Sequence, residues 1–230
     1  MFAPGLSSAR IPIYFRVLIT LGTVMALSPM ISGSVLGAIA DMPEDRRVLL
    51  IFQEIVKGSL IGLMGRFFLL GLQFAANTIW STIGLAGIPG IPMDELEAGS
   101  PLATLASTAA VVVILSLGLH IEMLRAIADS YEVLSLDAPL APAAMLNNLV
   151  MVLSESSLLA LRLAAPFIVY GIVVNLALGL ANRFAPQVSV YHATTGAVML
   201  GGFFLLYLIW SEWLMLFVSS YSAWLFRGGF

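Results

Sequence analysis

The sequence predicts an all-α, polytopic integral membrane protein whose long, broken helices form hairpins. Composition is the first observation behind this prediction: 60% of the 230 residues are hydrophobic, 10% are charged and the mean hydropathy is +1.01. Soluble domains are about 45–50% apolar and about 25% charged. The second observation is a series of apolar runs that reach or exceed the ~20 residues with which a helix crosses a bilayer. Such a chain has too little polar surface for a soluble globule, so lipid or hydrophobic partner subunits must cover much of its outside.

Two long apolar runs occupy the first part of the chain. The first extends from about Ile13 to Ile39, and we expect an interruption at Ser28-Pro29, because proline has no N–H to give to a helix. The second extends from Val48 to about Ala86, and as one straight helix it would be nearly twice as long as a bilayer core is thick. It is therefore predicted either to bend, near Gly71 or Asn77, or to project beyond the bilayer against protein.

A loop rich in proline and glycine, Gly87–Pro101, separates these runs from the rest of the chain. The next apolar run, Leu102–Leu119, continues into the amphipathic stretch His120–Leu134, which predicts one helix that leaves the apolar environment halfway along. Two further runs follow, Ala143–Asn182, which contains Pro166, and Thr194–Phe226. No internal repeat stands out, and residues 1–230 are expected to form a single membrane domain.

One face of the second run combines a carboxylate with two glycines. Glu54, Gly58 and Gly62 fall at i, i+4 and i+8, so they share one side of a helix. Glycines four residues apart let the backbone of another helix approach closely, and a neighbouring carboxylate can be satisfied across that contact. The pattern fits a tight polar seam between subunits and, equally, a helix pair within this chain.

Other polar residues in or beside the apolar runs have a structural interpretation. Glu155 and Arg162 lie two helical turns apart on one face of the Ala143–Asn182 run, with Asn175 further along, and we expect an intrachain role for them. His120 and His192 have no third candidate ligand at a useful spacing. We therefore interpret the histidines as polar residues near the ends of apolar segments, and predict no metal site.

The sequence carries no signature of catalysis. Cysteine is absent, which excludes disulfides, thiolate nucleophiles and iron–sulfur clusters. The G-x-S-x-G motif, a phosphate-binding glycine loop and clustered carboxylates are absent as well. We predict that the protein is not an enzyme and has no cofactor. The net charge of −3, with no basic face, argues against nucleic acid as a partner.

The segment LGLANRFAPQVSVY, Leu178–Tyr191, is the most specific motif in the chain. Together with Ala165-Pro166 and Asn175–Leu180 it gives an apolar helix containing Ala-Pro, then Asn-Leu-x-Leu-Gly-Leu, then Asn-Arg-x-Ala-Pro-Gln. This pattern resembles the FliR family, the flagellar biosynthetic export-gate proteins, whose close relatives serve virulence type III secretion systems. The segments EIVKGSLIGLMGRF and GLHIEMLRAIADSYEVL are similar to other parts of the family, so the resemblance spans nearly the whole chain.

The polar residues of this motif are interpreted as packing residues. Pro186 is expected to end the preceding helix, because proline disfavours helical backbone at the residue before it. Arg183 and Gln187, with Asn182 beside them, are expected to supply hydrogen bonds that fix either the next helix or a neighbouring subunit.

The chain departs from the family at three places. The family begins with a further apolar helix before the Ala-Pro that stands here at Ala3-Pro4, so we expect that first helix to be absent. The family's Asp-Pro is not kept in the central loop, and Leu134-Ser135 stands in place of its Leu-Pro.

The resemblance implies a structural and gating subunit of the flagellar type III protein export gate, without catalysis of its own. It implies assembly with FliP-like and FliQ-like membrane subunits, and with a FlhB-like export component, in the bacterial inner membrane at the flagellar basal body. Unfolded protein substrates would pass through the complex, and much of the complex would sit above the membrane plane.

The family's central loop is thought to plug the pore, and here it corresponds to about Gly84–Ser100. Glycine and proline suit a compact turn that can sit in a lumen and move aside. The residues singled out for this role are Gly84, Gly87, Pro89, Gly90 and Pro92. Without the resemblance, an exposed connector would be the preferred interpretation of this loop.

A small-solute membrane transporter is the alternative function. Helices broken at Ser28-Pro29 and Pro166, together with charges inside apolar runs, are typical of transporters. A transporter of this kind would also show an inverted repeat, which the sequence lacks. The export-gate subunit is therefore the preferred prediction.

Overall fold

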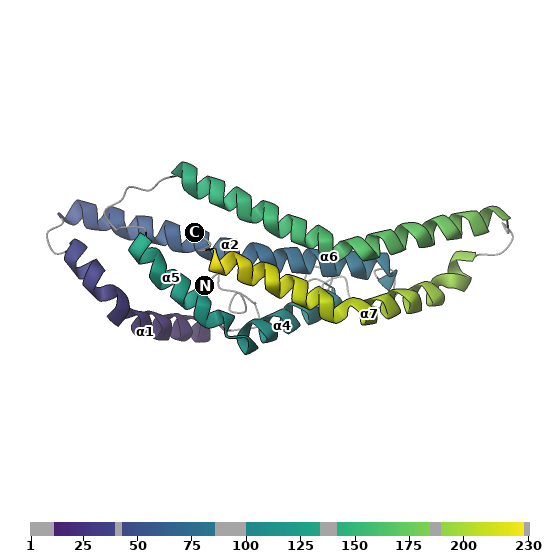
Figure 1. Cartoon of the computed structure of the whole chain (residues 1–230), viewed down its shortest axis with the longest axis horizontal. Helices are drawn as coiled ribbons and strands as arrows, with labels where there is room; N and C mark the ends of the chain where they lie inside the picture. The colour runs from purple at the N-terminus through teal and green to yellow at the C-terminus, as the bar shows by residue number, and fades with distance from the viewer. Residues whose placement is uncertain (1–11, 40–42, 86–99, 134–141, 185–189, 228–230) are drawn as a thin grey trace. The chain divides into compact units, whose positions relative to one another are not determined.

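The computed structural model describes residues 12–39, 43–85, 100–133, 142–184 and 190–227, and within these ranges it is helical, with no strand. The elements are α1 (Ile13–Ile39), α2 (Glu44–Thr82), α4 (Pro101–Ser116), α5 (Leu119–Val133), α6 (Pro142–Phe184) and α7 (Val190–Phe226) (Figure 1). The all-α prediction is confirmed.

Three helical segments in the described part of the chain are long and apolar enough to cross a membrane: Glu44–Thr82, Pro142–Phe184 and Thr194–Phe226. A fourth span arises if α4 and the first part of α5 are taken together across their break. The first run supplies a shorter apolar helix, Ile13–Pro29. The prediction of a polytopic membrane protein is thereby confirmed.

The second apolar run forms one uninterrupted helix. α2 has 39 residues and contains neither of the predicted bends, because Gly71 and Asn77 both lie inside regular helix. Of the two alternatives, the division into two helices is therefore wrong, and one helix longer than a bilayer core remains. The glycine and the asparagine have other roles, described below, and each costs a helix only about 1 kcal/mol or less relative to alanine.

The prolines also fail to end their helices. α1 continues through Pro29, although Figure 1 shows that the helix is bent, and α6 continues through Pro166. A proline inside a helix removes one hydrogen bond and kinks the helix, and the helix can continue on either side of the kink. The predicted interruption at Ser28-Pro29 is therefore at most a kink.

A break does occur where the sequence predicted one continuous helix from Leu102 to Leu134. α4 ends at Ser116 and α5 begins at Leu119, and the two helices are bent by 71° relative to each other. Gly118 makes this turn with φ +71, a left-handed conformation that costs residues with a Cβ about 1–2 kcal/mol. The Gly118 N–H donates to the Leu115 carbonyl, and the Ile121 N–H donates to the Gly118 carbonyl.

The chain divides into two compact units, each assembled from separate stretches of sequence. The first unit comprises Met1–Leu69, Val111–Glu155 and Tyr221–Phe230, and the second comprises Leu70–Ala110 and Ser156–Ser220. The single membrane domain predicted from the sequence stays a prediction.

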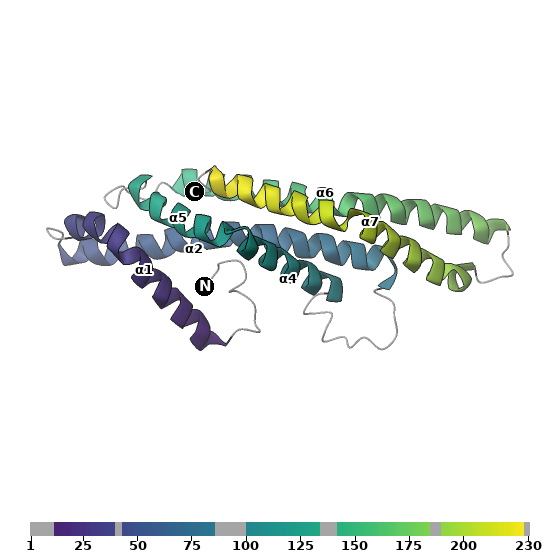
Figure 2. The ribbon, with the colours of Figure 1, turned by 60° about the horizontal axis from the view of Figure 1, so that its bottom comes forward.

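The first unit has an aromatic core. The rings of Phe68, Tyr221 and Trp224 lie with centroids 5.4 to 5.7 Å apart, and the Tyr221 hydroxyl donates to the Met123 sulfur at 3.1 Å. Ring pairs at such distances add about 0.5–1.5 kcal/mol to the burial of their surface. In the same unit α1 packs against α5, as two views of the chain show (Figures 1 and 2).

The second unit buries the last turns of α2 among parts of α4, α6 and α7. The buried residues at the end of α2 recur at helical spacing, one or two per turn, and Ile83 directly after the helix continues the series: Leu72, Ala75, Ala76, Ile79 and Ile83. α4 contributes small side chains, with Ala103, Ala106 and Ala110 all buried. Alanine and glycine at these contacts let helix backbones approach closely, which is how helices pack in membranes.

Candidate functional site

The two ends of the central loop are fixed to the last turns of α2. At the start, Gly84 adopts φ +86 after the helix, and its N–H donates to the Ser81 carbonyl at 3.1 Å. At the other end, the Ser100 N–H donates to Asn77 Oδ1 at 2.9 Å. Both described ends of this loop are therefore hydrogen-bonded to the last turns of α2.

Ser100 also caps the helix that follows the loop. Its hydroxyl oxygen accepts a hydrogen bond from the Ala103 N–H at 3.1 Å, and Pro101 occupies the first helical position. Serine is a preferred N-cap, and proline suits the first turn because that N–H would have no helical partner anyway. Ser100 is buried, so the cap and the bond to Asn77 together fix the backbone where the loop re-enters the helix.

Of the five loop residues predicted to plug a pore, Gly84 alone belongs to the described residues. Gly87, Pro89, Gly90 and Pro92 fall in residues 86–99, outside the described ranges. The plug assignment stays a prediction.

An open pocket of about 350 Å³ lies beside Gly84 in the second unit. Polar groups from three helices line it: Ser81 and Thr82 of α2, Asn175 of α6 and Thr195 of α7. The hydroxyls of Ser81 and Thr82 already donate to the Thr78 carbonyl. Its apolar lining includes Ile83, Ile168 and Val198, so the pocket mixes the two kinds of surface.

Glu54 finds its partner on its own helix. Glu54 Oε1 lies 2.9 Å from Lys57 Nζ, one turn further along α2, and the Lys57 side chain is 9% exposed. Gly58 is exposed, and a Cβ placed on it would meet no described atom within 4 Å. Gly62 is half-buried. Among the described residues no helix packs onto Gly58, so the interpretation of this face as a contact with another subunit stays a prediction.

Sequence reasoning missed several glycines at which segments of this chain approach closely. A Cβ on Gly71 would lie 2.9 Å from the Ser156 carbonyl oxygen, one on Gly171 2.5 Å from Thr82 Cγ2, and one on Gly202 2.6 Å from Ile83 Cγ1. All of these contacts lie within the second unit. No Gly-x-x-x-Gly pair marks Gly71 or Gly202 in the sequence. These contacts could not be predicted, because the local sequence does not show which helix faces each glycine.

Two side-chain hydrogen bonds join α6 to α7 in the second unit. Tyr170 Oη donates to the Val198 carbonyl at 2.6 Å, and Trp213 Nε1 donates to the Leu163 carbonyl at 3.1 Å. The Trp213 ring also stacks on Trp210 at 5.6 Å. These contacts confirm that the two helices form an antiparallel hairpin within this unit.

The polar motif between the last two apolar runs is partly described. α6 ends at Phe184, two residues before Pro186, as predicted. Asn182 and Arg183 are exposed, and neither side chain has a hydrogen-bond or ion-pair partner among the residues that the structure describes. Pro186 and Gln187 fall in residues 185–189, outside the described ranges. Whether this motif contacts its own chain or another subunit stays a prediction.

The charged residues predicted to lie together in α6 do not pair with each other. Glu155 forms an ion pair with Arg227, Oε1 to Nη1 at 3.0 Å, whereas Arg162 and Asn175 are exposed without a described side-chain partner. The intrachain role is confirmed for Glu155, whereas for Arg162 and Asn175 it stays a prediction. His120 is exposed, and no three metal-ligating side chains cluster within the described ranges.

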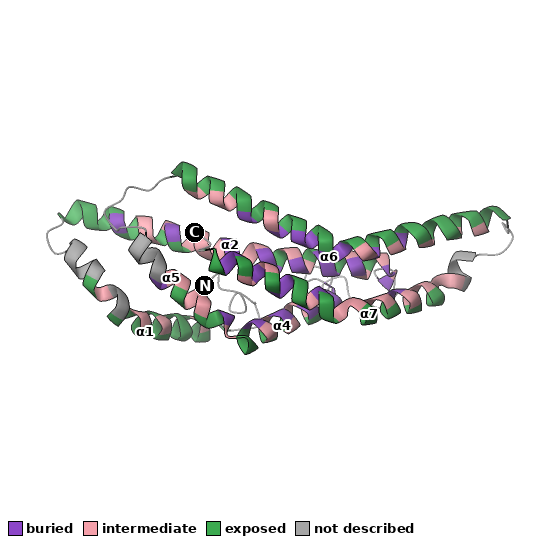
Figure 3. Cartoon of the chain, in the orientation of Figure 1, coloured by how far each residue is buried: buried purple, intermediate pink, exposed green. Residues whose placement is uncertain are grey.

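Many residues of the described helices are exposed (Figure 3), and large apolar side chains are numerous among them. In α6 the exposed large residues include Val169, Ile172, Val173 and Leu176, and in α7 they include Phe204, Tyr207 and Leu208. Scattered exposed leucines are ordinary, but continuous apolar faces of this length mark contact with lipid or with other proteins.

Comparison with known proteins gives consistent results. The sequence model of the family described as bacterial export proteins, family 1, matches residues 1–223. The chain is 26% identical over 225 residues to the flagellar biosynthetic protein FliR of Caulobacter vibrioides, covering 96% of this chain and 87% of that protein. It is 25% identical over 196 residues to the FliR of Escherichia coli, covering 82% and 71%, and 27% identical over 148 residues to that of Pectobacterium carotovorum, covering 63% and 55%.

Proposed function

The chain belongs to the FliR family, within family 1 of the bacterial export proteins, and from that premise we propose that it is a structural and gating subunit of the flagellar type III protein export gate. Its membership makes it a membrane-embedded component of the flagellar export apparatus. The finer proposal is that it assembles with FliP-like and FliQ-like subunits, and contacts a FlhB-like component, in the inner membrane at the basal body. Unfolded protein substrates are the cargo of this gate.

The observation that carries the proposal is the mismatch between helix length and bilayer thickness. α2 has 39 residues and α6 has 43. At about 1.5 Å per residue, helices of this size are roughly 60–65 Å long, about twice the ~30 Å of hydrocarbon in a bilayer. Even a strong tilt leaves a large part of each helix outside the lipid. Since apolar residues are exposed along these helices, other apolar protein surfaces must cover that part.

A gating role is supported by the way the central loop is held. Its described ends, Gly84 and Ser100, are both tied to the last turns of α2 by hydrogen bonds. A loop with fixed ends and many proline and glycine residues can change conformation without moving the helices that carry it. We propose that this loop closes the export channel until a substrate arrives.

The test is affinity purification of the tagged chain from its own cells after membrane extraction, with identification of the co-purifying proteins and the native mass of the assembly. We expect one large complex that holds two other small helical membrane proteins. A stable monomer or homodimer would contradict the proposal. Uptake of small solutes by proteoliposomes that contain the chain alone would then support a transporter, with the pocket beside Gly84 as its first candidate binding site.

A further inference from the structure

Two opposite charges lie at the same level of the α6–α7 hairpin. Trp213 donates its indole N–H to the Leu163 carbonyl at 3.1 Å, which fixes the register of the two helices at this point. Arg162 immediately precedes Leu163, and Glu212 immediately precedes Trp213. Both belong to the second unit, so their common level follows from contacts within that unit.

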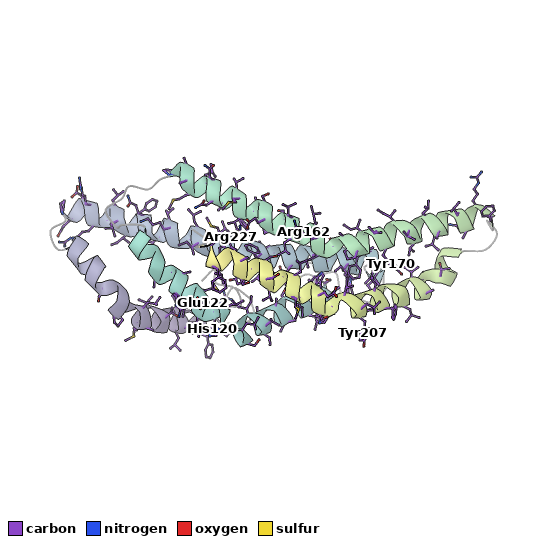
Figure 4. The ribbon with its side chains drawn as sticks, viewed as in Figure 1. His120, Glu122, Arg162, Tyr170, Tyr207 and Arg227 are labelled. Atoms are coloured by element: carbon purple, nitrogen blue, oxygen red, sulfur yellow. The ribbon has the colours of Figure 1, made fainter. Side chains whose placement is uncertain are left out.

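Neither charge is neutralised by the described part of the chain. Arg162, labelled in Figure 4, and Glu212 are both exposed, and neither has a hydrogen-bond or ion-pair partner among the described residues. This part of the surface therefore offers a cation and an anion.

The surroundings of these charges are apolar on both sides along each helix. Exposed apolar residues on α6 precede and follow Arg162, and others on α7 flank Glu212: Leu158, Leu161, Val169, Leu208, Met215 and Leu216. Both helices are apolar enough to cross a membrane. Unpaired charges in such surroundings are costly, and charged residues within spans normally face protein or water.

We propose that this surface, Arg162 and Glu212 with their exposed apolar neighbours, is the docking surface for an apolar helix of a neighbouring membrane subunit. The partner presents a carboxylate to Arg162 and a cationic side chain to Glu212. The inference rests on the proposed function, because it assumes a multi-subunit membrane assembly, and it adds which residues of this chain recognise the partner and by which charges.

A protein partner fits this surface better than lipid does. Headgroups lie where the apolar surface of a membrane protein ends, but here the exposed apolar surface continues on both sides of the two charges. Charges that lie inside an apolar protein interface select the partner and its register, while the surrounding apolar contacts exclude water.

Charge reversal separates this proposal from an ion pair within the chain. Arg162→Glu and Glu212→Arg are each introduced alone and then together, and the complex is recovered from membranes through a tag on this chain. We expect each single reversal to lower recovery of the complex about tenfold or more, relative to the amount of the chain in the membrane. The double variant should not restore recovery, because the partner's charges are unchanged. Full recovery with the double variant would show that the two residues pair with each other, and recovery near wild type with the single variants would equally overturn the proposal.

A photo-crosslinking experiment covers the case in which the reversals reduce the amount of folded chain. Leu161 and Met215, both more than half exposed beside the charges, are replaced one at a time by a photoreactive phenylalanine analogue. We expect crosslinks to a small helical membrane protein from both positions, whereas crosslinks to lipid alone would overturn the proposal.

The matched control for the charge reversals exchanges the charges of the exposed pair Glu122–Arg125, which keeps that pair intact and should leave recovery of the complex unchanged. Because the wild-type chain is purified in parallel, absence of any complex in that sample would instead contradict the proposed function.

Discussion

At the scale of single residues, a glycine decides how closely two helices of the second unit approach. A Cβ on Gly71 would lie 2.9 Å from the Ser156 carbonyl oxygen, and a backbone atom cannot swing away as a side chain can. We expect Gly71→Ala to destabilise the protein by about 1–3 kcal/mol, the usual cost of overpacking. Thermal unfolding of the purified protein measures this. The control is Gly196→Ala, where a Cβ would meet nothing within 4 Å and helix propensity favours alanine by up to about 1 kcal/mol. Equal stability of the two variants would mean that Gly71 is not a close contact.

At the scale of elements, α2 carries an ion pair in an otherwise apolar stretch. Lys57 is nearly buried and lies 2.9 Å from Glu54. We expect Lys57→Met to cost about 1–3 kcal/mol, because it leaves the half-buried carboxylate without its donor. The double variant Lys57→Met with Glu54→Gln should recover most of that loss. In the exposed pair of α5, Arg125→Met should change stability by less than about 1 kcal/mol. A Lys57→Met variant as stable as Arg125→Met would show that the α2 pair contributes little.

The connection between α2 and α4 gives a second prediction at this scale. Asn77→Ala removes the acceptor of the Ser100 N–H, and Ser100→Ala removes the N-cap of α4. Each should cost about 1 kcal/mol of stability, and their effects should not add, because both act on the same few residues of backbone. If the loop gates the channel, both variants should also alter export, measured as secreted flagellar protein per cell. Unchanged stability would show that these two hydrogen bonds do not hold the ends of the loop. Unchanged export would argue against a role of the loop in gating.

At the scale of the whole molecule, stability should depend on partner subunits. The exposed apolar faces of α6 and α7 extend further than the bilayer can cover, so we expect partner subunits to bind them. A partner that binds the folded chain but not the unfolded chain raises the unfolding temperature by mass action. We expect the chain produced without its partners to unfold at a lower temperature, and to be degraded faster in cells, than the same chain in the complex. Equal unfolding temperatures in the same detergent would indicate that the chain is stable as a monomer.

The sequence by itself determined the class of the protein and much of its helix plan. Composition and the length of the apolar runs predicted a helical membrane protein, and the Asn-Arg-x-Ala-Pro-Gln motif at Asn182–Gln187 predicted the family. Pro186 predicted the end of α6. These features are local, because hydropathy, a proline ring and a short motif are all read within a few residues of one another.

Only the tertiary structure decided which contacts the helices make. In the folded chain α2 stays continuous at Gly71 and α1 continues through Pro29, while Gly118, with its left-handed φ, breaks a run that looks continuous in sequence. The partner of Glu155 proved to be Arg227, far along the chain, and the Trp213 bond to Leu163 brought Arg162 level with Glu212. No local pattern contains this information, because hydrogen bonds and close approaches between helices depend on which faces meet, and that is settled by residues distant in sequence.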